Sequence, residues 1–124
     1  MDISFTDREL DVMSVLWETG AATVAEVRER LADPLAYTTV LTVLRILEEK
    51  GYARHEEEGR AHRYYPLVAR EAAGKSALSR LVRKVFRDSP EMLLTNLVSD
   101  RNLTREQLQR LRAQLDEELG KEEC

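Results

Sequence analysis

The chain has 124 residues, of which 43% are hydrophobic and 34% are charged, and its formal net charge is −4 at pH 7. This length fits one domain, or a small domain with an appendage. No apolar run approaches the roughly 20 residues that a membrane-spanning helix needs, and residues 1–11 lack the layout of a signal peptide. We therefore expect a cytoplasmic protein without membrane insertion. The single cysteine, Cys124, allows no internal disulfide.

Capping signals predict the first two helices. Thr6 and Glu9 have the spacing of an N-cap residue and its capping-box partner, directly before an apolar stripe. Thr23 and Glu26 repeat this signal before a shorter helix, and Pro34 lies where that helix must already have ended.

A third helix is predicted over residues 36–52 (AYTTVLTVLRILEEKGY), and its two faces differ in chemistry. At roughly 100° per residue, one face collects Val40, Leu44 and Leu47. The opposite face collects Thr38, Thr42, Arg45 and Glu49. Short hydroxyls and a guanidinium suit contact with phosphates and base edges, and Thr39 lies at the flank, where free N–H groups can meet a phosphate. The alternatives are an ordinary core helix and an ion pair between Arg45 and Glu49.

The hydrophobic period then changes, and two charged strands around Gly59 predict a hairpin over residues 52–66. Three helices followed by a hairpin is the order of a winged helix-turn-helix, in which the third helix enters the major groove. The hairpin residues expected to contact DNA are Arg60, His62 and Arg63. His62 and Arg63 point to opposite faces of a regular strand, so only one of them can face DNA.

The hairpin also raises the question of a metal site, because His55 and His62 can lie across it from each other. Two histidines with scattered glutamates do not make a structural zinc set. The chain also lacks a Gly-rich phosphate loop and a nucleophile motif. We therefore expect no metal, no cofactor and no enzyme activity.

Residues 70–120 predict three more helices, which have little core volume of their own. We expect them to pack against a second copy, with an interface formed by Leu78, Leu81, Val82, Val85, Phe86, Leu93, Leu97, Leu108, Leu111 and Leu115. The alternative is that these helices fold back on the first part. The predicted fold is mostly α, with a winged helix-turn-helix domain of three helices and a two-stranded wing at 1–68, and a three-helix dimerisation domain at 69–124.

Several segments together resemble the penicillinase-repressor (BlaI/MecI-type) family of winged-helix transcriptional regulators: FTDRELDVMSVLWETG (5–20), TVAEVRERL (23–31), AYTTVLTVLRILEEKG (36–51), EEEGRAHRYYPLV (56–68), SALSRLVRKVF (76–86) and LTREQLQRLRAQL (103–115). The resemblance implies a dimeric repressor that covers an operator and blocks transcription of resistance or stress genes. It also implies release when a membrane-bound sensor metallopeptidase triggers cleavage at an Asn-Phe bond. The matching position here is Asn96-Leu97, with Leu in place of Phe.

Three functions remain open at this point. The first is a dimeric repressor on a palindromic operator of double-stranded DNA. The second is a winged-helix module for protein–protein contacts, which suits the eight Lys/Arg against thirteen Asp/Glu of residues 1–66. The third is a regulator that releases DNA on binding a small ligand. The threonines and arginine of the third helix favour DNA, because a protein partner more often meets aromatic or aliphatic anchors.

Overall fold

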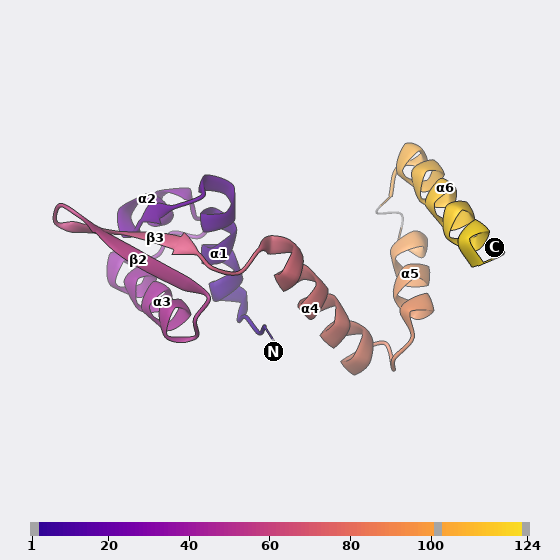
Figure 1. The fold of residues 1–124 in the computed structure, drawn as a ribbon, viewed down its shortest axis with the longest axis horizontal. Helices are drawn as coiled ribbons and strands as arrows, with labels where there is room; N and C mark the ends of the chain where they lie inside the picture. Colours follow the sequence, from indigo (N-terminus) through magenta and orange to yellow (C-terminus); the bar gives the residue numbers. More distant parts are fainter. Residues whose placement is uncertain (1–2, 101–102, 123–124) are drawn as a thin grey trace. The chain divides into compact units, whose positions relative to one another are not determined.

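The computed structural model describes residues 3–100 and 103–122, so Cys124 lies outside the described part. The elements, in chain order, are α1 (Asp7–Thr19), β1 (Ala22–Thr23), α2 (Val24–Arg30), α3 (Tyr37–Glu49), β2 (Ala53–Glu58), β3 (Ala61–Pro66), α4 (Arg70–Lys84), α5 (Pro90–Ser99) and α6 (Arg105–Glu122) (Figure 1). The chain forms two compact units, residues 1–79 and 80–124, which divide inside α4. The prediction of a mostly helical fold with an N-terminal winged helix is confirmed.

Capping boxes start α1 and α2, as predicted. The Thr6 hydroxyl accepts from the Glu9 N–H at 3.1 Å, and the Glu9 carboxylate accepts from the Thr6 N–H at 2.7 Å. Thr23 and Glu26 make the same reciprocal pair at 3.2 and 3.1 Å. Each pair satisfies two backbone donors that the helix itself cannot, which fixes where the helix begins.

The core of the first unit is shared by α1, α2, α3 and the sheet. Leu16, Val27 and Leu44 contribute fully buried side chains from the three helices, and Tyr64 contributes one from β3. Because each helix presents an apolar stripe at helical spacing, the three stripes close on one another and on one face of the sheet. The β2–β3 hairpin, called the wing below, projects beyond these helices (Figure 1).

The sheet has three strands in the order β1-β3-β2, so the predicted two-stranded hairpin was incomplete. β1 pairs antiparallel with β3, with Ala22 opposite Tyr64 and Thr23 opposite Arg63. A strand of two residues is too short to show an alternating pattern, which is why the sequence did not reveal it. The added strand attaches the start of α2 to the wing.

A partly buried ion pair connects the beginning of α1 with the end of α3. Glu9, of which only 4% is exposed, accepts from the Lys50 ammonium at 3.0 and 2.9 Å through its two oxygens. Burial by itself raises the pKa of Glu9. The hydrogen bonds from the Thr6 N–H and from Lys50, together with the positive charge of Lys50, outweigh it and lower that pKa below its ordinary value of 4.5.

The first turns of α4 belong to the first unit. The only tryptophan, Trp17, donates its indole N–H to the Val68 carbonyl at 2.7 Å, and the Arg70 guanidinium lies 5.6 Å from its ring centre. Ala73 is buried, and the Ser76 hydroxyl donates to the Ile3 carbonyl at 2.8 Å. These contacts place residues 70–79 with the winged helix.

The second unit consists of the end of α4, α5 and α6. Ser89 caps α5 by accepting from the Met92 N–H at 3.2 Å, and Thr104 and Gln107 form a capping box at the start of α6. None of residues 80–100 and 103–121 is buried. No helix in the described ranges combines the length and the apolar composition needed to cross a membrane.

Candidate nucleic-acid interface

The outward face of α3 carries the polar residues that the sequence assigned to DNA. Val40, Leu44 and Leu47 are fully buried, whereas Thr38, Thr39, Thr42 and Arg45 are all exposed. The Thr42 hydroxyl donates to the Thr38 carbonyl at 2.9 Å. Since its hydrogen is used inside the helix, the Thr42 oxygen faces solvent as an acceptor.

The N-terminus of α3 differs from those of its neighbours. Ala36 occupies the N-cap position and makes no side-chain hydrogen bond to the first turn, whereas threonines cap α1 and α2. The Thr39 N–H donates to the Ala36 carbonyl at 3.1 Å, so the N–H groups of Tyr37 and Thr38 are the ones that remain available to an acceptor from outside the protein. Such groups, aligned with the helix dipole, favour a phosphate.

A small hollow lies between α3 and the wing. Its volume is about 130 Å³, and it is lined by Val24, Tyr37, Leu41, Arg45, Arg60 and His62. Tyr37, Leu41 and Arg45 are four residues apart on α3 and form one stripe that faces the wing. Arg45 therefore lies between the threonine face of α3 and the cationic residues of the wing.

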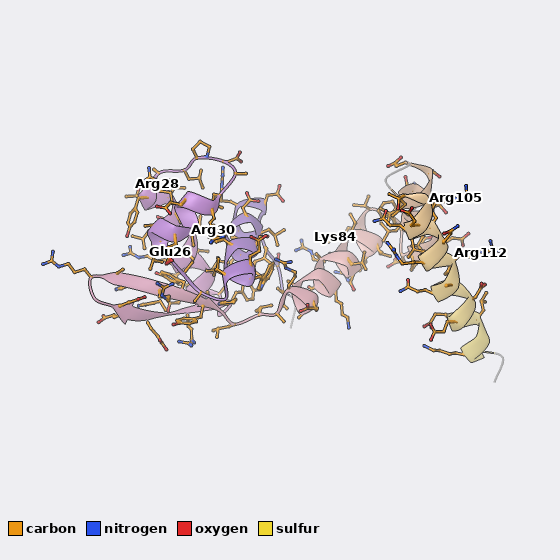
Figure 2. The ribbon with its side chains drawn as sticks, turned by 90° about the horizontal axis from the view of Figure 1, so that it is seen from above. Glu26, Arg28, Arg30, Lys84, Arg105 and Arg112 are labelled. Carbon is orange, nitrogen blue, oxygen red and sulfur yellow. The ribbon has the colours of Figure 1, made fainter. Side chains whose placement is uncertain are left out.

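Several charged groups around this interface neutralise one another. Arg54 pairs with Glu56 at 2.8 Å, and Arg63 pairs with Glu26 of α2 at 3.0 Å and also with Glu58. Glu26 and its neighbours on α2, Arg28 and Arg30, are labelled in Figure 2. Arg45 and Arg60 form no ion pair or hydrogen bond with other residues of the described part, so their charges remain available to a partner.

The alternation of side chains along β3 separates His62 from Arg63. His62 lines the hollow with Arg45 and Arg60, whereas Arg63 is engaged by two carboxylates. The Glu58 hydrogen bond, with further help from Glu26, raises the pKa of Arg63 above its ordinary value. The hydrogen bond from the Thr23 N–H, and further the charge of Arg63, lower the pKa of Glu26. Arg63 thus attaches the wing to α2.

The two histidines stack on each other in the wing. Their ring centres lie 4.4 Å apart with an interplanar angle of 14°. Nδ1 of His55 lies 2.7 Å from a carboxylate oxygen of Glu48, which connects β2 to the end of α3. Burial raises the pKa of the neighbouring Tyr64, with Glu48 adding to the rise and Arg45 opposing it. No group of three or more metal-ligating side chains gathers within residues 3–100 and 103–122.

None of the residues predicted for the dimer interface is buried: Leu78 lies in the first unit and the others lie in the second. Seven of them are exposed: Leu78, Leu81, Val85, Leu97, Leu108, Leu111 and Leu115. The remaining three are half-buried: Val82, Phe86 and Leu93. A groove of about 530 Å³ runs between α5 and α6, and its apolar lining consists of Leu94, Val98, Leu108, Leu111 and Leu115.

The predicted cleavage position lies within α5. Asn96 and Leu97 are both exposed, and the Asn96 side chain donates to the Met92 carbonyl one turn earlier, at 2.8 Å. The bond between Asn96 and Leu97 is therefore part of a regular helix.

The penicillinase repressor family model matches residues 5–117 of the chain, which includes both units. The chain belongs to the penicillinase repressor family. The transcriptional regulator BlaI of Mycobacterium tuberculosis is 44% identical over 68 residues, covering 52% of this chain and 49% of that protein. The chain thus matches about half the length of that relative. The penicillinase repressor of Bacillus licheniformis is 25% identical over 114 residues, covering 90% of this chain and 89% of that protein.

A solved structure from the same family shares the winged helix. The solution structure of the Bacillus licheniformis BlaI monomeric form in complex with the blaP half-operator has a TM-score of 0.50 and 30% sequence identity. It covers 58% of this chain and 90% of that chain. The relatives are named as regulators and repressors, which supports the prediction that this penicillinase-repressor family member is not an enzyme.

Sequence reasoning missed three features of these surfaces. Tyr37 was not singled out, although its spacing of four and eight residues from Leu41 and Arg45 was visible in the sequence. The partners of Arg63 were missed because Glu26 is distant in the chain, and only the pairing of β1 with β3 brings it near. Leu94 and Val98, which line the groove, were readable as apolar residues four apart on α5.

Proposed function

We propose that this chain is a transcriptional repressor that binds a palindromic operator in double-stranded DNA as a homodimer. The observation that carries the proposal is the exposed α3 face, with an N-terminus that no side chain caps and with the unpartnered Arg45 and Arg60 beside it. Thr38 and Thr42 offer small polar groups to base edges, and Thr39 offers one to the backbone at the flank. In the wing, Arg60 and His62 face the DNA, and Arg63 holds the wing in place.

The acidic composition of the first unit does not contradict this proposal. Glu9 pairs with Lys50, Glu56 pairs with Arg54, and Glu26 and Glu58 share Arg63, so part of the negative charge is compensated inside the protein. Because salt screens charges beyond roughly 10 Å, a phosphate near α3 responds mainly to the cations beside it. A small positive surface in an acidic body is then sufficient, and its binding depends steeply on salt.

Gel-shift titration tests DNA binding. A palindromic promoter fragment should shift at low salt, a scrambled fragment of the same length should shift at much higher protein concentrations, and both shifts should weaken as salt rises. Equal affinity for the two fragments, or no shift at low salt, contradicts the proposal.

Arg45→Ala tests the base-reading residue. This change should weaken specific binding by about 1–3 kcal/mol, because one bidentate contact to a guanine is lost. Arg54→Ala is the matched control, since Arg54 is engaged by Glu56 and the Tyr65 ring on the same wing. If both variants bind the operator equally well, the assignment of Arg45 is wrong.

The homodimer is supported by the exposed leucines of the second unit. A lone unit of 45 residues with no buried side chain among its described residues lacks the core that an independent fold needs. A second copy would cover this surface, and two copies of α3 would then reach two half-sites of a palindrome. In sedimentation the full chain should be a dimer and a chain ending at Ser79 a monomer. A dimer of the shortened chain would place the interface in the wrong unit.

Release by cleavage between Asn96 and Leu97 completes the proposal, with a membrane-bound sensor metallopeptidase as the trigger. A protease cleft binds extended peptide, so α5 must first unwind there. In the single chain, a helix of ten residues without a buried side chain opens at little cost. Incubation with the sensor protease should give two fragments whose masses place the cut at this bond. An uncut chain points to another mode of release.

A further inference from the structure

The hollow between α3 and the wing is lined by two arginines that form no ion pair with other residues of the described part. Arg45 reaches it from α3, Arg60 from the turn of the wing, and His62 from β3. The Tyr37 hydroxyl adds a hydrogen-bond donor. Since the neighbouring Arg54 and Arg63 are paired with carboxylates, the unpaired cations are concentrated at this position.

The size of the hollow restricts what can occupy it. Its volume of about 130 Å³ is well below the roughly 300–1,000 Å³ of sites for drug-sized ligands. A tetrahedral phosphate group with one or two waters is of suitable size. The combination of two guanidiniums, a hydroxyl and an imidazole is donor-rich, as phosphate oxygens require.

Resting on the DNA-binding function proposed above, we propose that this hollow seats one backbone phosphate of the operator, and that His62 supplies its third positive charge when protonated. The site therefore makes operator binding depend on pH in the range where histidine changes charge, between about pH 5 and 8. His62 is the only histidine among the residues that line the hollow.

Charged and titratable groups face His62 from α3, from β2 and from the turn. They are Tyr37, Arg45, Glu48, His55, Glu57 and Arg60. α2 contributes only Val24 to the hollow, and Glu26 is engaged by Arg63. Glu48 is engaged by His55, whose ring separates that carboxylate from His62 in the stack. Glu57 is the carboxylate directly opposite His62 in the strand register.

The coupling between proton and phosphate follows from these positions. Arg45 and Arg60 repel a third positive charge in the free protein, and so does His55 whenever it carries a proton. A phosphate seated among these cations removes that repulsion and attracts the imidazolium. Phosphate binding and proton binding therefore favour each other, so the operator complex takes up a proton as it forms.

Operator binding by the full chain at pH 6 and pH 8 tests the inference, using fluorescence anisotropy at several salt concentrations. The wild type should bind roughly two- to fivefold more tightly at pH 6, the range of one exposed ion pair. The plot of log affinity against log salt should be steeper at pH 6 by about 0.9, the contribution of one more phosphate contact. His62→Gln should bind at both pH values as the wild type binds at pH 8.

Two further variants separate His62 from its surroundings. His62→Lys carries a permanent charge and should bind at pH 8 as tightly as the wild type at pH 6. His55→Gln keeps His62 and should retain the pH dependence. If His62→Gln keeps the wild-type pH dependence, or if the wild type binds its operator equally at both pH values, the phosphate seat is refuted while the proposed function stands. Absence of specific operator binding at either pH refutes the proposed function itself.

Discussion

The two compact units of this chain use their leucines in opposite ways. In the first unit, Leu16 and Leu44 are fully buried between helices and sheet. In the second, Leu97, Leu111 and Leu115 remain 43%, 37% and 58% exposed. Both units contain helices that a side chain caps, so local helix formation does not distinguish them. They differ in whether the apolar faces meet within one chain, and a unit whose faces do not meet requires a partner.

The largest expected effect is on the closed core of the first unit. Leu44→Ala should lower its free energy of unfolding by about 2–5 kcal/mol, because a fully buried side chain leaves a cavity. Denaturant unfolding followed by Trp17 fluorescence measures the change. Leu115→Ala removes the same atoms from an exposed position and should leave this transition in place. Equal losses in both variants would show that the two units do not differ in this way.

A charge in the groove of the second unit should affect assembly instead. Leu111→Glu should weaken the dimer by about 100-fold or more, roughly 3 kcal/mol, because a carboxylate would be buried without a partner. Gln109→Glu adds the same charge on α6 outside the groove lining and should leave the dimer intact. Sedimentation equilibrium gives both dissociation constants. A Leu111→Glu dimer as tight as the wild type would argue against the groove as the interface.

The Glu9–Lys50 pair should give the first unit a pH dependence that the second lacks. The folded-state pKa of Glu9 is lowered, so its contribution to stability is present above the unfolded value near 4.5 and is lost as pH falls through the folded value. Glu9→Gln should cost about 1–3 kcal/mol at pH 7 and should flatten the acid side of the stability profile.

Thermal unfolding between pH 3 and pH 7 measures this profile. Glu29→Gln, an exposed carboxylate on α2, is the control and should retain the acid-dependent loss. A Glu9→Gln profile parallel to that of the wild type would mean that other groups carry the acid sensitivity.

The smallest expected effects come from removing one threonine N-cap from a helix in each unit. Thr23→Ala should lower the unfolding free energy of the first unit by about 1 kcal/mol. Thr104→Ala removes an equivalent cap from α6, and its cost of about 1 kcal/mol should appear as weaker dimerisation and lower helicity. Circular dichroism and sedimentation of both variants separate these results. Unchanged helicity and dimerisation in Thr104→Ala would show that this cap does not stabilise the second unit.

The sequence was informative where structure depends on near neighbours. A helix start depends on residues only three positions apart, without contacts from elsewhere in the chain. The pairs Thr6–Glu9 and Thr104–Gln107 and the cap residue Ser89 are of this kind. It was uninformative where distant residues meet. β1 has only two residues, and its pairing with β3 brings Glu26 to Arg63. Whether Arg63 pairs with Glu26 thus depends on strand register, which short charged strands specify weakly.

The candidate site shows the same division. The exposed threonines of α3 followed from helix period alone, because Val40 and Leu44 had to face inward. That Arg45 would share a hollow with Arg60 and His62 depended on how the wing packs on α3. No local pattern contains that information. The whole-chain resemblance supplied the family, and the side-chain contacts show which cations remain available.

Trp17 gives this chain a built-in optical probe. As the only tryptophan, it is held by the Val68 carbonyl, by a T-shaped contact with the Phe5 ring whose centre lies 6.2 Å away, and by Arg70. Detachment of the first turns of α4 would expose this indole to water and shift its emission to longer wavelength. Unlabelled protein can therefore report, in real time, whether DNA binding or a cut in α5 loosens the start of α4.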